Sequence, residues 1–187
     1  MNPTVLIPLA NGCEELEAVT FTDLLRRADI NVITASLEEN MLITASRGMH
    51  LTADTTLENV IYDDFDMIIL PGGMPGTTNL NNSASIHAIL KRMHQEKKMI
   101  AAICAAPLVL AHAGLLDGKK VTCFPGVLNP ADWPSITISQ EAIVIDEHLL
   151  TSQSPGTAMD FALIIIEQLK GKDFRDRVEV ELVRTQL

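Results

Sequence analysis

Segments typical of buried strands alternate with segments typical of helices along almost the whole chain. Short apolar runs bounded by turn residues predict strands at residues 4–10, 31–36, 66–70, 99–103, 121–124, 142–146 and 149–153. Helical patterns cover residues 14–28, 83–98, 106–112 and 155–171, and a further amphipathic stretch begins at residue 173. Residues 41–57 alternate around a glycine and predict a hairpin. The alternation predicts an α/β fold with a mainly parallel sheet covered on both faces.

Composition limits the classes of protein to which the chain can belong. We expect its 187 residues to form a single domain over residues 1–187, with a core built from aliphatic side chains because aromatic residues make up only 4%. A net charge of −10 disfavours strong binding to nucleic acid or to an anionic membrane, and we interpret it as a contribution to solubility. No apolar run is long enough to span a bilayer, and the N-terminus lacks a signal-peptide pattern.

The cysteine and histidine residues are sparse and show no ligand spacing. Cys13, Cys104 and Cys123 form no CxxC pair, and the five histidines form no HxxxH pair. This pattern predicts a reducing compartment, the cytoplasm, rather than a disulfide framework. We also expect no metal site and no cofactor.

Three distinctive segments directly follow predicted strands. NGCEELE follows residues 4–10, PGG follows residues 66–70, and Cys104 follows residues 99–103. In parallel α/β sheets, ligands bind beyond the carboxyl ends of the strands. The three segments therefore predict a functional site at this edge of the sheet.

Cys104 has two interpretations, a small buried hydrophobe or a nucleophile on a strand-to-helix turn. Alanines flank it on both sides, as a crowded turn requires. A helix beginning just after it, with Pro107 in the first turn, would direct free N–H groups at the sulfur and favour the thiolate. The pair Gly72 and Gly73 could supply an oxyanion-hole donor together with the N–H of Ala105. We interpret Cys104 as the nucleophile.

Glu17 differs from Glu14 and Glu15 in the face of the predicted helix that it occupies. At helical spacing it shares a stripe with residues that should face the sheet, namely Cys13, Phe21, Leu24 and Ala28. Apolar surroundings disfavour a carboxylate and raise its pKa. A protonated Glu17 could donate a hydrogen bond to a Cys104 thiolate and move protons at neutral pH, and we predict this pair.

The motifs GCEELEAVTFTDLLRRA, ASRG, ILPGGMPG, AAICAAP and LTSQSPGTAMDFAL together resemble those of the ThiJ/PfpI family. The resemblance covers nearly the whole chain and is nearest to the branch of the human parkinsonism-associated protein deglycase and its bacterial relatives. It implies a flavodoxin-like three-layer sandwich, similar to class I glutamine amidotransferases, and a homodimer. It also implies a reactive Cys104, a protonated Glu17, and backbone donors at Gly73 and Ala105.

The resemblance further implies substrate or anion binding by Arg27, Arg47 and Gly72. In similar proteins the two matching arginines lie near the site, partly across the dimer interface. Arg27 has a second interpretation, a basic residue that suits the dipole at the C-terminal end of its helix. For Arg47, which lies within the predicted hairpin, the site interpretation is preferred.

The family's described activities are cofactor-independent glyoxalase III chemistry, deglycation of early dicarbonyl adducts, chaperone action and oxidative-stress sensing. The resemblance thus implies an enzyme acting on small dicarbonyls or glycated protein side chains. The alternative is a redox-responsive stress protein or chaperone in which Cys104 is oxidised to the sulfinate. A flavin- or dinucleotide-binding module is a third hypothesis, but GGxxG at residues 72–76 is not the GxGxxG fingerprint and aromatic residues are few.

Two features depart from the family pattern. Phe124 stands where many relatives carry a histidine, and Ala105 stands where the protease-like branch carries one. A Cys–His dyad is therefore unavailable at either position, and we expect no peptidase activity and a lowered glyoxalase rate. The second departure is Cys13, which we hypothesise resolves a Cys104 sulfenic acid as a disulfide.

Overall fold

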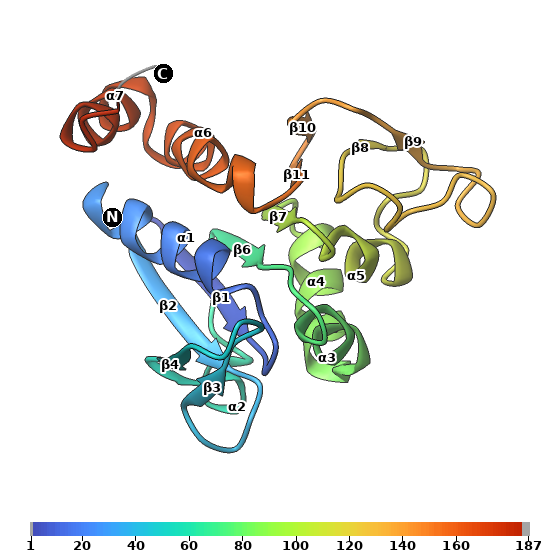
Figure 1. Cartoon of the computed structure of the whole chain (residues 1–187), viewed down its shortest axis with the longest axis horizontal. Coiled ribbons are helices and arrows are strands. Elements are labelled where there is room, and N and C mark those ends of the chain that lie inside the picture. Colours follow the sequence, from blue (N-terminus) through green and yellow to red (C-terminus); the bar gives the residue numbers. More distant parts are fainter. Residues whose placement is uncertain (1, 185–187) are drawn as a thin grey trace.

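A seven-stranded sheet forms the centre of the computed structural model, which describes residues 2–184 (Figure 1). Its strands are β1 (Thr4–Leu9), β2 (Asn31–Ser36), β5 (Thr55–Thr56), β6 (Met67–Leu70), β7 (Met99–Ile103), β10 (Ile143–Asp146) and β11 (Leu149–Ser152). They lie in the order β10-β11-β7-β6-β1-β2-β5, and only β10 runs antiparallel to its neighbour. The predicted mainly parallel sheet is confirmed.

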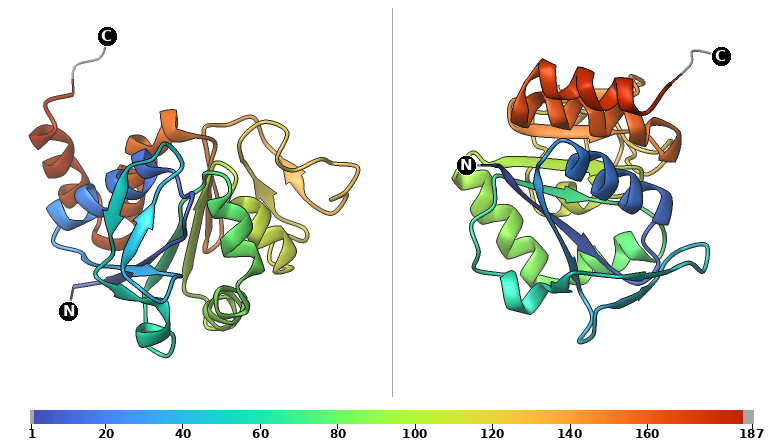
Figure 2. Two further views of the ribbon diagram at one scale, coloured as in Figure 1. Left: turned by 60° about the horizontal axis from the view of Figure 1, so that its bottom comes forward. Right: turned by 90° about the vertical axis from the view of Figure 1, so that its left-hand side faces the viewer.

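Helices cover both faces of this sheet (Figure 2). One face carries α1 (Glu15–Arg27), α6 (Ala158–Lys170) and α7 (Lys172–Glu181), and the short 3₁₀ helix η1 (Pro155–Thr157) precedes α6. The other carries α2 (Leu57–Val60), α3 (Gly76–Asn82), α4 (Ala84–Gln95) and α5 (Pro107–His112). The predicted three-layer α/β fold is thereby confirmed.

The central strands are apolar throughout because both of their faces are buried. Successive side chains of a strand point to opposite faces. Leu6 of β1 accordingly lies in the core under α4 and α5, whereas Val5 and Ile7 lie in the core under α1 and α6. In that second core, Phe21 and Phe161 meet edge to face with ring centroids 5.9 Å apart.

The order of the strands determines at which edge of the sheet the site lies. The chain passes from β1 to β2 on one side and then to β6 on the other side of β1. Such a reversal leaves a crevice beyond the carboxyl ends of the strands. The segments that follow β1, β6 and β7 all begin at this edge.

Several predicted boundaries were wrong. The turn after β6 leads into a helix, α3, that was not predicted. The strand expected at residues 121–124 is only β8 (Lys120–Val121), which pairs with the unpredicted β9 (Thr137–Ile138) outside the main sheet. The N–H of Thr122 instead donates to the Thr151 hydroxyl, and the N–H of Phe124 donates to the carbonyl of Cys104. The predicted hairpin is confirmed as β3 (Leu42–Thr44) and β4 (His50–Thr52).

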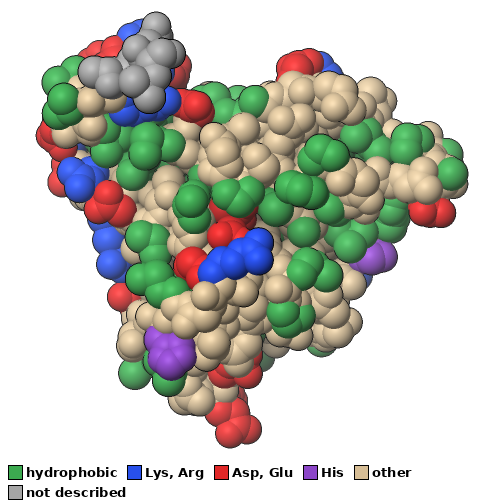
Figure 3. Space-filling model, viewed as in Figure 1, with side chains coloured by type: hydrophobic (Ala, Val, Ile, Leu, Met, Phe, Trp, Pro, Cys, Tyr) green, Lys and Arg blue, Asp and Glu red, His purple; other side chains and the backbone are tan. Residues whose placement is uncertain are grey.

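Charged side chains of both signs lie on the surface. On the face shown in Figure 3, Lys and Arg side chains are scattered among acidic and hydrophobic ones. Within residues 2–184, no helix is both long enough and apolar enough to cross a bilayer.

Candidate active site

Cys104 occupies a strained turn between β7 and α5. Its φ is +60°, a value that side chains with a Cβ rarely adopt. Two backbone hydrogen bonds hold the turn, from the Cys104 N–H to the carbonyl of Ser152 at 3.0 Å and from the Phe124 N–H to the carbonyl of Cys104 at 2.8 Å. Cys104 is partly exposed, whereas its neighbours Ala105 and Ala106 are buried. The geometry is that of a presented nucleophile.

Gly72 fits against this turn because it has no side chain. A Cβ added to Gly72 would lie 2.7 Å from the Cβ of Cys104 and 3.0 Å from the nitrogen of Ala105. The N–H of Gly72 donates to Oε2 of Glu17 at 2.7 Å. One glycine therefore contacts both residues of the predicted pair.

Glu17 lies on the buried face of α1 and is 0% exposed. Burial raises its pKa to about 7, with a smaller contribution from the charge of Glu14, while the N–H of Gly72 and the thiol of Cys104 act in the opposite direction. Its second oxygen, Oε1, is buried and has no hydrogen-bond partner among the described residues. Because Oε2 is already an acceptor, Oε1 is the oxygen available to carry a proton towards Cys104.

The thiol of Cys104 is also perturbed. Burial and the negative charge of an ionised Glu17 raise its pKa to about 12, against the N–H groups of Gly73 and Ala105 that contact the sulfur and lower it. The expectation that the site favours the thiolate is therefore wrong, first because burial disfavours the charged sulfur and second because an ionised Glu17 repels it. When Glu17 is protonated this repulsion disappears, so the two groups titrate as a coupled pair.

The loops after β1 and β6 pack backbone against backbone. The N–H of Glu14 donates to the carbonyl of Gly72 at 2.9 Å, and the N–H of Gly76 donates to the carbonyl of Gly12 at 3.1 Å. Gly73 has a φ of +88°, and a Cβ there would lie 2.4 Å from the nitrogen of Glu14. The structure thus brings together the three segments that the sequence placed at one edge of the sheet.

The turn of the β3–β4 hairpin docks on the first turn of α1. The N–H of Arg47 donates to the Glu15 carboxylate at 3.0 Å, and the Ser46 hydroxyl lies 3.0 Å from one oxygen each of Glu14 and Glu15. The N–H of Ser46 donates to the carbonyl of Cys13 at 2.8 Å. Arg47 therefore lies beside the loop after β1, with an exposed side chain. Sequence reasoning missed Ser46, although the motif ASRG contains it.

Within one protomer, Arg27 lies away from Cys104. Its Nε pairs with Asp23 at 2.9 Å on the exposed side of α1. Ten residues along the helix, or about 15 Å, separate it from Glu17. Within one protomer, the observed geometry of Arg27 is that of a helix-end ion pair. The implied binding role of Arg27, which partly concerned a second protomer, stays a prediction.

Cys13 and Cys104 are both free thiols. Cys13 is completely buried, and burial together with the charge of Glu15 raises its pKa to about 12. Since the attacking species in disulfide formation is a thiolate, this environment works against the hypothesis that Cys13 resolves an oxidised Cys104.

Within residues 2–184, no three His, Cys, Asp or Glu side chains gather as a metal-ligand cluster.

Comparison with known proteins identifies a family that matches almost the whole chain. Residues 3–168 match the model of the DJ-1/PfpI family. The chain is 40% identical over 176 residues to protein DJ-1 homolog A of Arabidopsis thaliana, and this match covers 94% of the chain but 45% of that longer protein. It is 38% identical to protein dj-1beta of Drosophila melanogaster, with 92% of each chain covered.

The chain is also similar to a protein of known structure and to a relative that is named for an enzymatic activity. The crystal structure of Drosophila melanogaster DJ-1beta superposes with a TM-score of 0.95 at 37% identity, covering all of both chains. A relative in Caenorhabditis elegans, 32% identical over 90% of this chain and 89% of its own length, is named glutathione-independent glyoxalase DJR-1.2. Similarity also extends to the Parkinson disease protein 7 homolog of Danio rerio, at 35% identity over 95% of each chain. The chain belongs to the DJ-1/PfpI family, in its DJ-1 (Parkinson disease protein 7) branch.

Proposed function

We propose that this protein is a cofactor-free enzyme that uses Cys104 to convert reactive 2-oxoaldehydes, or their early adducts on protein side chains. The observation that carries the proposal is the pairing of a buried Glu17 with a cysteine on a strained turn. A carboxyl group with a pKa of about 7 can both accept and return a proton at neutral pH.

In the first step, the proton of the Cys104 thiol passes to Oε1 of Glu17. The sulfur then attacks the aldehyde carbon, a C–S bond forms, and the carbonyl oxygen becomes an oxyanion. The N–H groups of Gly73 and Ala105 hold the thiolate before attack, and we assign them to the adjacent oxyanion afterwards. Protonation of that oxygen by Glu17 completes a hemithioacetal.

In the second step, the Glu17 carboxylate removes the hydrogen of the former aldehyde carbon as a proton, and the carbon–carbon bond becomes the double bond of an enediolate. The hydroxyl proton of the first carbon passes to the oxygen of the second carbon, and Glu17 returns its proton to the second carbon, so that the first carbon becomes a thioester carbonyl and the second an alcohol. The first carbon is oxidised and the second reduced, so no external electron carrier is needed. The product is a thioester of a 2-hydroxy acid. Water cleaves the C–S bond, which releases the acid and restores the thiol.

The test is lactate formation from methylglyoxal in the absence of glutathione by the wild type, Cys104→Ala and Glu17→Gln. We expect turnover in the wild type, none in Cys104→Ala and a loss of about 10²-fold or more in Glu17→Gln. Wild-type lactate no greater than that of Cys104→Ala would refute the proposal.

A second candidate is a redox-responsive stress protein in which Cys104 becomes a sulfinate. The observation that favours it is that the sulfur contacts two N–H donors and lies beside a carboxyl group that can carry a proton. A similar solved structure, 36% identical with a TM-score of 0.92, is that of oxidized Toxoplasma gondii DJ-1. Mass spectrometry after peroxide treatment tests it, and an unmodified Cys104 in a folded protein would exclude it.

We also propose a homodimer that uses α1 and the β3–β4 hairpin. Leu16 and Val19 on α1 are 51% and 44% exposed, and Met49 beside the hairpin is 53% exposed. Apolar side chains gathered on one side of a protein are typical of an interface. Sedimentation analysis of Val19→Glu against wild type tests this assembly, and an unchanged mass would argue against it.

A further inference from the structure

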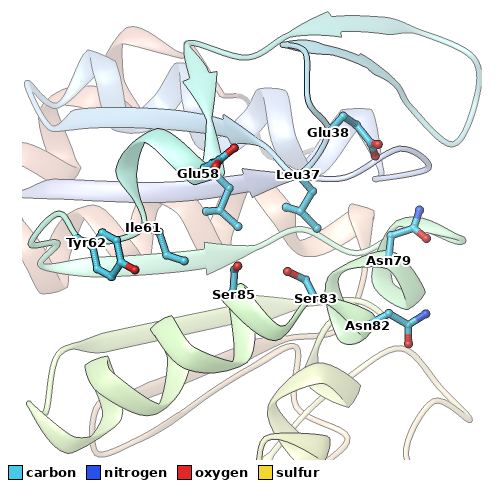
Figure 4. A pocket seen from close by; sticks show the side chains of 10 residues that line it. Leu37, Glu38, Glu58, Ile61, Tyr62, Asn79, Asn82, Ser83 and Ser85 are labelled. Carbon is cyan, nitrogen blue, oxygen red and sulfur yellow. The ribbon is translucent and has the colours of Figure 1, made fainter.

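A groove lies beside the loops of the site, and we call it the Tyr62 groove. It has a volume of about 830 Å³ and is bounded on one side by α2 and the segment after β2, and on the other by α3 and the start of α4 (Figure 4). Figure 4 shows Leu37 and Ile61 directed towards the space that Ser83 and Ser85 face from the opposite wall. Nothing in the reaction at Cys104 uses these side chains.

The charge of the Tyr62 groove is entirely negative. Glu38 and Glu58 line it, and none of its described lining residues is Lys, Arg or His. The only hydrogen bond found for either carboxylate among the described residues is a long one, 3.5 Å, from the N–H of Asn11 to Glu38. Two carboxylates without a cation in a shared groove favour a positively charged ligand and disfavour a phosphate.

A second hollow, of about 380 Å³, is also lined by Tyr62 and carries a small net negative charge, from three carboxylates and two cations. Its lining includes Asp63, Asp64, Glu96, Arg92 and Lys98. Both cations are already engaged. The guanidinium of Arg92 donates to the carbonyls of Ile61 and Asp63 at 3.0 and 2.9 Å, and Lys98 pairs with Asp64 at 3.3 Å.

Tyr62 lines both hollows and is 89% exposed. An aromatic face of this kind attracts Lys and Arg side chains through cation–π contact, and tyrosine is enriched in binding hot spots. Leu37, Leu57 and Ile61 give the groove an apolar floor. A Lys or Arg side chain has the matching structure, because it carries a charged head on an aliphatic stem.

The opposite wall can bind a peptide backbone. Asn82 and Ser85 make no side-chain hydrogen bond to other residues within 2–184, so their amide and hydroxyl groups are available to a ligand. The Ser83 hydroxyl accepts the N–H of Ile86 at 3.3 Å and caps α4.

We propose that the Tyr62 groove binds an extended Lys- or Arg-rich segment of a partner protein. One basic side chain lies on Leu37 and Ile61 with its head at Glu38 and Glu58, and the next crosses Tyr62 towards the second hollow. The proposal does not depend on the reaction at Cys104.

The test is fluorescence anisotropy with a fluorescein-labelled octapeptide of alternating lysine and alanine, at low and at physiological ionic strength. We expect the wild type to bind it, more weakly as salt rises, and not to bind the glutamate–alanine counterpart. The double variant Glu38→Gln/Glu58→Gln should weaken binding by about tenfold or more, and Tyr62→Ala by several-fold.

The matched control is Asp132→Asn/Glu181→Gln, which makes the same change in net charge at exposed positions outside the groove. It should bind the peptide like the wild type, and so should Cys104→Ala. Equal weakening by both double variants would show attraction by net charge alone and overturn the proposal. Wild-type affinity in the groove variants would overturn it as well, while turnover of methylglyoxal reports separately on Cys104.

Discussion

Glu17 and Cys104 are held together by the same short piece of backbone. The N–H of Gly72 fixes Oε2 of Glu17 at 2.7 Å, and the α-carbon of Gly72 faces the Cβ of Cys104 with no room for a side chain. The carboxyl group is thereby oriented with its second oxygen free for the thiol. The proton shared by this pair governs both its charge and its reactivity.

Replacing Glu17 by Gln should lower the pKa of the Cys104 thiol, because the carboxylate charge that raises it disappears while the N–H donors remain. The measurement is the ultraviolet absorbance of the thiolate against pH, with Cys104→Ala subtracted. Glu14→Gln is the matched control, since the charge of Glu14 raises the pKa of Glu17, whereas the pKa of the Cys104 thiol is set by burial, Glu17 and the two N–H donors. An unchanged thiol titration in Glu17→Gln would contradict the coupling.

The raised pKa of Glu17 also predicts a dependence of stability on pH. The folded protein binds the proton up to a pKa of about 7, whereas the unfolded chain releases it near 4.5. Stability therefore falls as pH rises between these values, by about 3 kcal/mol in total, and is flat outside them for this group. Denaturant unfolding at about pH 5 and about pH 8 measures the change. Glu17→Gln should lose this component, and an equal slope in both proteins would show that other groups cause it.

The layered fold could be predicted because its causes are local. Strands buried on both faces are apolar throughout, as in MIIL of β6, and both ends of the last long predicted helix carry clear signals, Pro155 and Gly171. Helix α3 was missed because its sequence, GTTNLNN, has weak helix propensity. Its position is fixed by tertiary contacts such as the bond from Gly76 to the carbonyl of Gly12.

The pairing of Glu17 with Cys104 could be predicted from helical phase and from the ends of the strands. The electrostatic state of Cys104 could not, because it depends on how deeply both groups are buried and on their mutual repulsion. The position of Arg27 was inferred from similar proteins, and part of that inference concerned a second protomer. The docking of Ser46 on α1 depends on a contact between residues more than thirty positions apart, for which the local sequence carries no signal.

Gly72→Ala should disrupt the site because the new methyl group would lie 2.7 Å from the Cβ of Cys104. The turn must shift, so we expect loss of most turnover and a decrease of about 1–3 kcal/mol in the free energy of unfolding. Gly156→Ala is the control, because its methyl group would meet only the Ser154 hydroxyl at 3.6 Å and its φ is ordinary. Denaturant unfolding and lactate formation check both variants. A fully active Gly72→Ala protein would show that the close approach has no role.

Phe124→His should raise the turnover of methylglyoxal several-fold. The backbone bond from residue 124 to the carbonyl of Cys104 does not involve the side chain, and Phe124 is 46% exposed, so the fold should tolerate the change. An imidazole beside the turn would add a second proton carrier with a pKa near neutrality. The pH profile of kcat/KM should then gain a limb that the wild type lacks. Phe124→Leu separates this effect from loss of the aromatic ring, and equal rates in the two variants would mean that the histidine takes no part in proton transfer.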